Sequence, residues 1–217
     1  MTAALKKDIQ RITPLPMPVS IEQFLDWDPD NTQYRYELRR GVIFQMPKPR
    51  GQHSDIAGFI HDELAFEIRQ KKYPYSIPRE CVVKISNDTG DEPDAIVLDR
   101  TQIKEESLWE KSSTIQNGAT VKLIVEVVSS NWQDDYELKL AAYESIGIPE
   151  YWIVDYAGLG GIRHIGRPKQ PTLTICKLIE GEYEVSRIRA NEKVPSELSP
   201  EFSSIAEQIL TFQPIQN

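Results

Sequence analysis

Two acidic residues stand in segments that we expect to be buried. Glu126 interrupts the β-branched run 122–128, which is typical of a strand covered on both faces. Asp94 opens a second apolar strand over 94–98. A buried carboxylate is costly unless it is paired or bound to a metal ion. Because Mg²⁺ takes one or two protein carboxylates and leaves its other positions to water and phosphate oxygens, these two residues could share one divalent cation.

Lys139 is the third residue that could take part in chemistry. At 100° per residue it shares a face of a predicted helix with Tyr143, which carries its amine towards the packed side. All three residues also have structural interpretations. Lys139 could form a surface pair with Asp135 at i,i+4 spacing, or extend to water. Glu126 could pair with a nearby arginine or lysine, and Asp94 could be a turn residue.

The elements that must position these residues alternate between strands and helices, as in the α/β class. Apolar residues recur every four positions over 53–72, which predicts an amphipathic helix that lies on a sheet. Asp134 or Asp135 is expected to cap the helix that ends before Gly147. Ser204 and Glu207 are expected to cap a short C-terminal helix. A capping box at Ser20 and Gln23 predicts a helix over 20–28. We expect the strands 77–85 and 94–98 to pair with each other. The full set of predicted strands is 34–38, 42–46, 77–85, 94–98, 122–128, 151–154, 172–178 and 182–188.

Composition excludes several classes of protein. The 217 residues include 25 Lys and Arg against 33 Asp and Glu, a net charge of −8, which excludes a strongly basic wrapper of nucleic acid. With 2 cysteines and 3 histidines, a disulfide framework, a cysteine zinc cluster or a histidine-rich metal site is not expected, and Cys81 and Cys176 read as reduced core residues. No apolar run could span a bilayer and no secretory signal is evident, so we expect a cytoplasmic protein without membrane contact.

The length predicts one large domain with extensions. Residues 1–19 mix basic residues and prolines without periodicity and are expected to form a flexible N-terminal arm. The domain itself is predicted over 20–190. Residues 191–217 would then form a C-terminal tail with a short helix.

Taken together, the motifs resemble the PD-(D/E)XK nuclease superfamily, and more closely its large family of uncharacterised proteins described as putative restriction endonucleases. The resemblance covers roughly residues 20–190. It is carried, in order, by Tyr36-Glu37-Leu38 with Gly41, His53, Pro93-Asp94, Glu126-Val127-Val128-Ser129, Asp135 with Lys139, and Glu150-Tyr151-Trp152-Ile153-Val154-Asp155. The sequence departs from the superfamily at Val128, where lysine is expected. In the resembling family the lysine is supplied by the following helix, and here Lys139 stands in that place.

This resemblance implies a restriction endonuclease-like core, with a central mixed β-sheet flanked by helices, and metal-dependent hydrolysis of phosphodiester bonds in nucleic acid, with DNA as the expected substrate. Asp94 and Glu126 would hold Mg²⁺ or Mn²⁺, and a backbone carbonyl near Val127 or Val128 would complete the site. The cation would withdraw charge from the phosphate and lower the pKa of a bound water. Lys139 would position that water or neutralise the charge that develops on the phosphate.

Further residues are carried over from the same family. His53 could contact substrate or the attacking water, although a helix-start histidine often has no partner, and Glu37 could add a ligand or form a cross-strand salt bridge with an arginine. Residues 34–53 hold five basic residues and one acid, so Lys48 and Arg50 could contact phosphates. A homodimer would supply two sites for the two strands of a duplex. The alternative function is a catalytically inactive nucleic-acid-binding or accessory protein that retains the fold.

Overall fold

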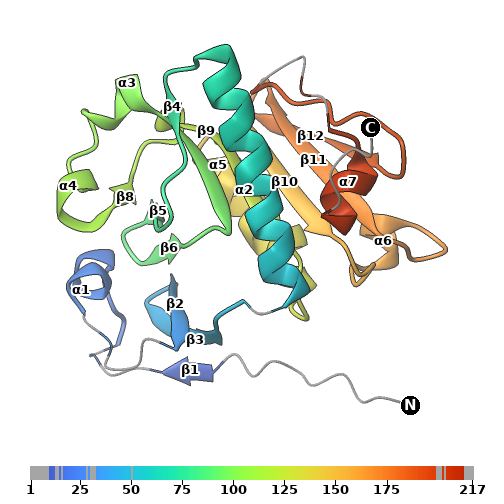
Figure 1. Cartoon of the computed structure of the whole chain (residues 1–217). Coiled ribbons are helices and arrows are strands. Elements are labelled where there is room, and N and C mark those ends of the chain that lie inside the picture. Colours follow the sequence, from blue (N-terminus) through green and yellow to red (C-terminus); the bar gives the residue numbers. More distant parts are fainter. Residues whose placement is uncertain are drawn as a thin grey trace.

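The computed structural model describes residues 10–12, 15, 17–27, 29, 33–49, 51–198, 202 and 204–212. Within these ranges the strands form two six-stranded sheets, each with parallel and antiparallel neighbours (Figure 1). The first sheet has the order β1 (Gln10–Ile12), β3 (Val42–Pro47), β2 (Tyr34–Arg39), β6 (Thr89–Asp91), β5 (Val82–Ser86) and β8 (Thr114–Ile115). The second has the order β12 (Glu182–Ile188), β11 (Thr172–Ile179), β10 (Glu150–Asp155), β9 (Val121–Val127), β7 (Ala95–Asp99) and β4 (Tyr75–Ser76).

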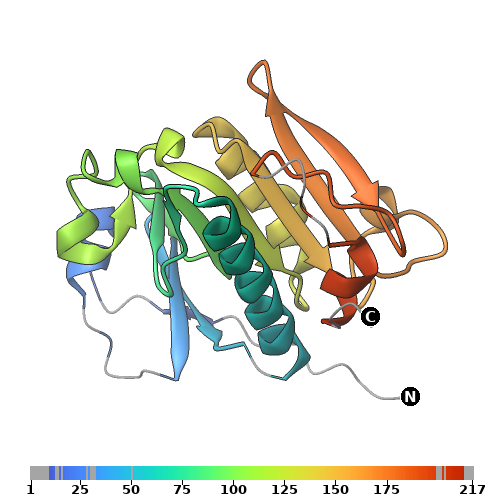
Figure 2. The ribbon, with the colours of Figure 1, turned by 45° about the horizontal axis from the view of Figure 1, so that its top comes forward.

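Helices cover both faces of the second sheet. The helical elements are α1 (Ile21–Asp26), α2 (Gln52–Lys71), α3 (Arg100–Ile103), α4 (Trp109–Ser112), η1 (Gly118–Thr120), η2 (Asp134–Lys139), α5 (Leu140–Ser145), α6 (Ile162–Ile165) and α7 (Ala206–Thr211). Figure 2 shows α2 lying across one face of this sheet, with α7 beside it. The apolar stripe of Ile56, Ile60 and Leu64 on α2 is fully buried there. The α/β class is therefore confirmed, with the strands distributed over two mixed sheets.

Strands β9 and β10 form the centre of the second sheet. They run parallel, and the helix formed by η2 and α5 connects them, as the sequence predicts. Because side chains alternate across a strand, Val125 and Val127 pack on the α2 side, whereas Ile124 and Val128 pack on the side of η2 and α5. This alternation decides which face each functional side chain of β9 reaches.

Several local predictions are confirmed by the structure. The Ser20–Gln23 capping box is present at α1, and its two hydrogen bonds measure 2.9 and 3.2 Å. The hairpins β2–β3 and β11–β12 form around the expected turns. Cys81 and Cys176 are buried and do not form a disulfide. No helix in the described ranges has the length and apolarity needed to cross a membrane.

Other predictions differ from the structure. The segments 77–85 and 94–98 do not pair, because β5 joins the first sheet and β7 the second. Gln10–Ile12, inside the predicted flexible arm, pairs with β3, while residues 1–9 lie outside the described residues. The predicted C-terminal tail packs into the main core through six residues, which are Val194, Leu198, Phe202, Ala206, Ile209 and Leu210. The hydroxyl of Ser204 does not cap α7 but donates to Glu63 Oε2 of α2 at 3.0 Å.

Two glycines with contrasting surroundings give a test of this packing. A Cβ added at Gly118 would collide with the backbone carbonyl oxygen of Ile146, whereas one added at Gly58 on α2 would meet nothing within 4 Å. We expect Gly118→Ala to lower the free energy of unfolding by about 2 kcal/mol, since rigid backbone must move. Gly58→Ala should raise it by about 0.5–1 kcal/mol. Urea denaturation of both variants measures the difference, and equal stabilities would contradict the placement of η1.

Candidate active site

Asp94 and Glu126 meet because β7 and β9 are antiparallel neighbours. Ala95 pairs with Val125, so the start of β7 lies beside the end of β9. The backbone N–H of Val127 donates to Asp94 Oδ2 at 2.8 Å. The two acids are 32 positions apart in the chain, and the pairing of β7 with β9 brings them together.

Glu126 faces the helix that follows its strand. Since Val125 and Val127 point towards α2, the side chain between them points towards η2 and α5. There Glu126 Oε1 accepts a hydrogen bond from the hydroxyl of Tyr143 at 3.0 Å and lies 2.9 Å from Lys139 Nζ. The side chain is 2% exposed. Glu126 therefore pairs with a nearby lysine, as its structural interpretation predicts. This partner, Lys139, is also the lysine proposed for catalysis.

Lys139 occupies the centre of the site. Its amine lies 2.9 Å from Glu126 Oε1, 3.2 Å from Glu37 Oε1 and 4.0 Å from Asp135 Oδ1. The side chain is only 7% exposed, so the i,i+4 pair with Asp135 is present but buried, and the alternative of a lysine that extends to water is wrong. Asp135 is buried as well.

The helix that carries Lys139 has an unusual form. Residues Asp134–Lys139 make a π-helical turn, and the helix already begins at Trp132, so neither Asp134 nor Asp135 caps it as predicted. π-turns are rare and occur frequently at functional sites. Here the turn buries Asp135 and Lys139 together with Tyr136. At the ordinary 100° spacing Asp135 and Lys139 already lie about 40° apart on one helix face.

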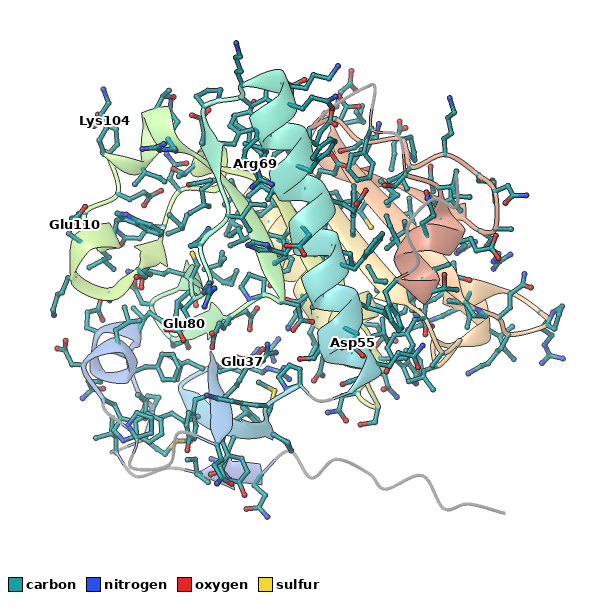
Figure 3. The ribbon with its side chains drawn as sticks, viewed as in Figure 1. Glu37, Asp55, Arg69, Glu80, Lys104 and Glu110 are labelled. Atoms are coloured by element: carbon teal, nitrogen blue, oxygen red, sulfur yellow. The ribbon has the colours of Figure 1, made fainter. Side chains whose placement is uncertain are left out.

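Glu37 connects the first sheet to the same amine. It lies on β2, and Arg39 donates to its Oε2 at 2.5 Å through Nη2 and 3.2 Å through Nε. Arg39 also pairs with Asp134 at 2.9 Å. Glu37 therefore pairs with an arginine of its own strand, and not across the hairpin as predicted, and it also contacts the proposed catalytic lysine. Figure 3 shows Glu37 and Asp55, which lies near the start of α2, towards the same end of the molecule.

Asp94 is held by one residue from each of two other elements. Arg35 Nη1 of β2 pairs with its Oδ1 at 2.9 Å, and His53 Nε2 of α2 lies 3.4 Å from its Oδ2. His53 is therefore not a helix-start residue without a partner. Its other ring nitrogen, Nδ1, is buried and has no hydrogen-bond partner within the described residues. Arg35, 20% exposed, lines the opening of the site with Ser129 and Asn131.

The environment shifts the pKa values of the carboxyl groups in opposite directions. Burial alone would raise the pKa of Asp94, but the hydrogen bond from His53 and the charge of Arg35 outweigh it and lower the pKa. Burial raises the pKa of Glu126 to about 7, and Lys139 offsets only part of this effect. Burial also raises the pKa of Asp135 well above its usual range. The lowered pKa of Asp94 favours its anionic form. The raised pKa values of Glu126 and Asp135 favour their protonated forms.

Sequence reasoning missed two members of the site. Asp91 of β6 is buried, and burial together with the charge of Glu37 raises its pKa to about 7. Asp91 follows Gly90 in β6, where an added Cβ would lie 2.7 Å from the side chain of Ile21, and this close packing is not visible in the sequence. In the sequence, Arg35 is only one of the five basic residues of the segment 34–53. Because Arg35 and Arg39 are paired with acids inside the site, this segment is less positive than its sequence suggests.

The two residues predicted to contact phosphates give no evidence of a built site. Lys48 is exposed just beyond β3. Arg50 lies outside the described residues.

The donor set suits a hard cation that keeps several water ligands. Within the described ranges no three His, Cys, Asp or Glu side chains are arranged to hold a metal ion. Asp94, Glu126 and Val127 nevertheless line one opening, and Mg²⁺ needs only one or two protein carboxylates. Carboxyl groups also outnumber cationic side chains around this opening, so added positive charge would be accommodated.

A family model matches residues 21–211, and its description is Uma2, putative restriction endonuclease. Among solved structures, the chain is similar to the crystal structure of a putative nuclease belonging to DUF820 from Anabaena variabilis ATCC 29413. The identity is 17% and the TM-score 0.64, and the match covers 90% of this chain and 99% of that chain, which shows a common fold. A comparison with curated proteins gave no match. Since the family match spans every element that carries the site, the chain belongs to the Uma2 family of putative restriction endonucleases.

Proposed function

We propose that this protein is a metal-dependent nuclease that hydrolyses phosphodiester bonds of DNA. The observation that carries the proposal is the convergence of Asp94, Glu126 and Lys139 from three separate segments at one opening. A buried cluster of this kind costs stability compared with apolar packing, so it is expected where function requires it. Membership in a family of putative restriction endonucleases supports the same activity.

In this proposal, Asp94, Glu126 and the Val127 carbonyl would hold Mg²⁺ or Mn²⁺. When bound, the cation supplies Lewis acidity towards a phosphate oxygen and lowers the pKa of a coordinated water. The chain's own residues do the rest. Arg35 and His53 keep Asp94 ionised, and the amine of Lys139 offers a fixed positive charge to the phosphate that becomes more negative during the reaction.

The test is nicking of supercoiled plasmid DNA with Mg²⁺ or Mn²⁺ and with EDTA. We expect nicking with either cation, none with EDTA, and none for Asp94→Ala. Asp62→Ala is the matched control, because Asp62 is an 87% exposed aspartate on α2. Calorimetry should detect cation binding to the wild type and to Asp62→Ala but not to Asp94→Ala. Cleavage of both strands would in addition require two sites, for which we propose a homodimer.

An inactive protein gives a different pattern. If the wild type neither binds the cation nor cleaves DNA or RNA, the buried acids serve only the fold, and the alternative of a non-catalytic nucleic-acid-binding protein takes precedence. Cleavage that survives Asp94→Ala would show that the site has been placed wrongly.

A further inference from the structure

A long basic segment lies outside the site described above. From residue 156 to residue 179 the chain contains no Asp or Glu, although its net charge is −8. The segment includes the exposed residues Arg163, Arg167 and Lys169. Arg187 of β12 joins them, because its guanidinium donates to the carbonyl oxygen of Arg163 at 2.9 Å. We call these four residues the basic platform.

The segment that carries the platform is fixed at its base. The buried carboxylate of Asp155 accepts hydrogen bonds from the backbone N–H groups of Leu159 at 2.9 Å and Gly160 at 2.8 Å. At Gly161 an added Cβ would lie 2.8 Å from the ring of Trp132, so the backbone here packs directly against that ring. These contacts fix the backbone of residues 159–161, from which the segment continues to the three cations.

The platform is attached to the helix that carries the site. The ring of His164 stacks on Tyr136, with centroids 4.8 Å apart and an interplanar angle of 27°. Tyr136 precedes Lys139 by three residues in the same π-turn. Arg163 also pairs with Glu137 of that turn. The packing therefore fixes the platform relative to Lys139.

Topology places both features at one edge of the second sheet. The site lies at the carboxyl end of β9, and the basic segment follows the carboxyl end of β10, its parallel neighbour. In α/β sheets, ligands bind outside the carboxyl ends of parallel strands. An extended polyanion at the site would therefore pass close to the platform.

Charge inside the platform is only partly neutralised. Glu137 offsets Arg163. The amine of Lys169 donates to the carbonyl oxygen of Leu159 at 3.1 Å, which leaves its charge intact. Arg167 is exposed. These two cations are free to neutralise phosphates, which is the main source of affinity for nucleic acid.

We propose that the basic platform binds the phosphate backbone of the nucleic acid beside the point of cleavage. This inference rests on the proposed nuclease function. The contact is with phosphates, so it carries no base specificity and serves DNA and RNA duplexes alike.

The test measures the salt dependence of binding in EDTA, where cleavage is not expected. Fluorescence anisotropy follows labelled DNA and RNA duplexes of about 30 base pairs between about 50 and 200 mM NaCl. The variant Arg167→Ala/Lys169→Ala should bind about tenfold more weakly, and the slope of log K against log salt should fall by about 1.8, because each lost phosphate contact removes about 0.9.

The matched control is Arg69→Ala/Lys104→Ala, which removes the same net charge. Both residues are exposed, and Figure 3 shows them towards the end of the molecule opposite Glu37 and Asp55. Arg69 stands 16 residues after His53 on α2, about 24 Å along the helix. We expect this control to keep the wild-type slope.

The outcomes separate the two proposals. Equal slopes for the two double variants, or no binding by the wild type, would overturn the platform, while the plasmid assay decides the nuclease function independently. If the wild type cleaves nothing but binds duplexes with a slope that depends on Arg167 and Lys169, the platform stands and the nuclease proposal fails.

Discussion

Replacing Lys139 with methionine is expected to reduce DNA cleavage by about 10²–10³-fold, the usual cost of removing one fixed charge or donor from a site that stabilises a developing anion. The same change should lower the free energy of unfolding by about 3–5 kcal/mol, because it leaves Glu126 and Glu37 buried without their shared cation. Plasmid nicking and urea denaturation measure the two effects.

A control on the same sheet separates position from charge. Lys122 lies on β9 like Glu126, but its amine pairs with Asp99 at 3.2 Å and its side chain is 30% exposed. Lys122→Met should therefore retain cleavage and lose less than about 1 kcal/mol of stability.

A second variant tests whether the loss of cleavage in Lys139→Met results from unfolding. Combining Lys139→Met with Glu126→Gln removes one unpaired buried charge, so stability should recover in part while cleavage stays lost. A folded Lys139→Met protein that cleaves at the wild-type rate would remove Lys139 from the mechanism.

The sequence predicts the central residues of the site because their signals are local. Glu126 stands out as an acid in an apolar strand, and Asp94 as an acid at the start of another. The pairing of these two strands is a finding of the structure, because the sequence pattern predicts that 94–98 pairs with 77–85 instead. The inward direction of Lys139 follows from helical periodicity.

Other members of the site could not be predicted in this way. The π-turn that carries Asp135 and Lys139 could not be predicted, because no single residue type marks such a turn. Arg35 and Asp91 reach the site because the first sheet packs against the second, which is a tertiary relation. The placement of β5 and β7 in different sheets is also a tertiary relation. It depends on which strands pair, and the alternation of apolar and polar residues within each strand does not determine that. Local patterns therefore indicate the acids and the lysine, whereas the residues that tune them come from long-range packing.

Raising the pH is expected to destabilise the protein in the absence of divalent cations. Glu126 and Asp91 each have a folded-state pKa of about 7, above the ordinary values of 4.5 and 3.8. Between these values the folded state binds more protons than the unfolded state, so stability falls as the pH rises from about 5 to about 8. Glu37 and Asp94 have lowered pKa values in the folded state, so the stability that they contribute is lost as the pH falls below about 4. This acidic range does not overlap with the range from about pH 5 to about pH 8, in which Glu126 and Asp91 titrate.

Because both groups are buried close to the same charges of Glu37 and Lys139, we expect a total loss of about 2–4 kcal/mol across this window. Urea denaturation in EDTA at several pH values measures it. Glu126→Gln should reduce the pH dependence markedly, since one titrating carboxyl is gone. Glu110→Gln, which changes an exposed glutamate on α4, should leave it unchanged.

Mg²⁺ should then restore stability most strongly at the upper end of the window. A cation that binds only the folded state adds about 2.7 kcal/mol at 100 times its dissociation constant, and binding is tighter where the acids have already lost their protons. The gain should therefore be larger near pH 8 than near pH 5, and Glu126→Gln should diminish it. A gain that is the same at both pH values would show that the cation binds elsewhere, because only carboxyl groups with raised pKa values couple its binding to protons in this range.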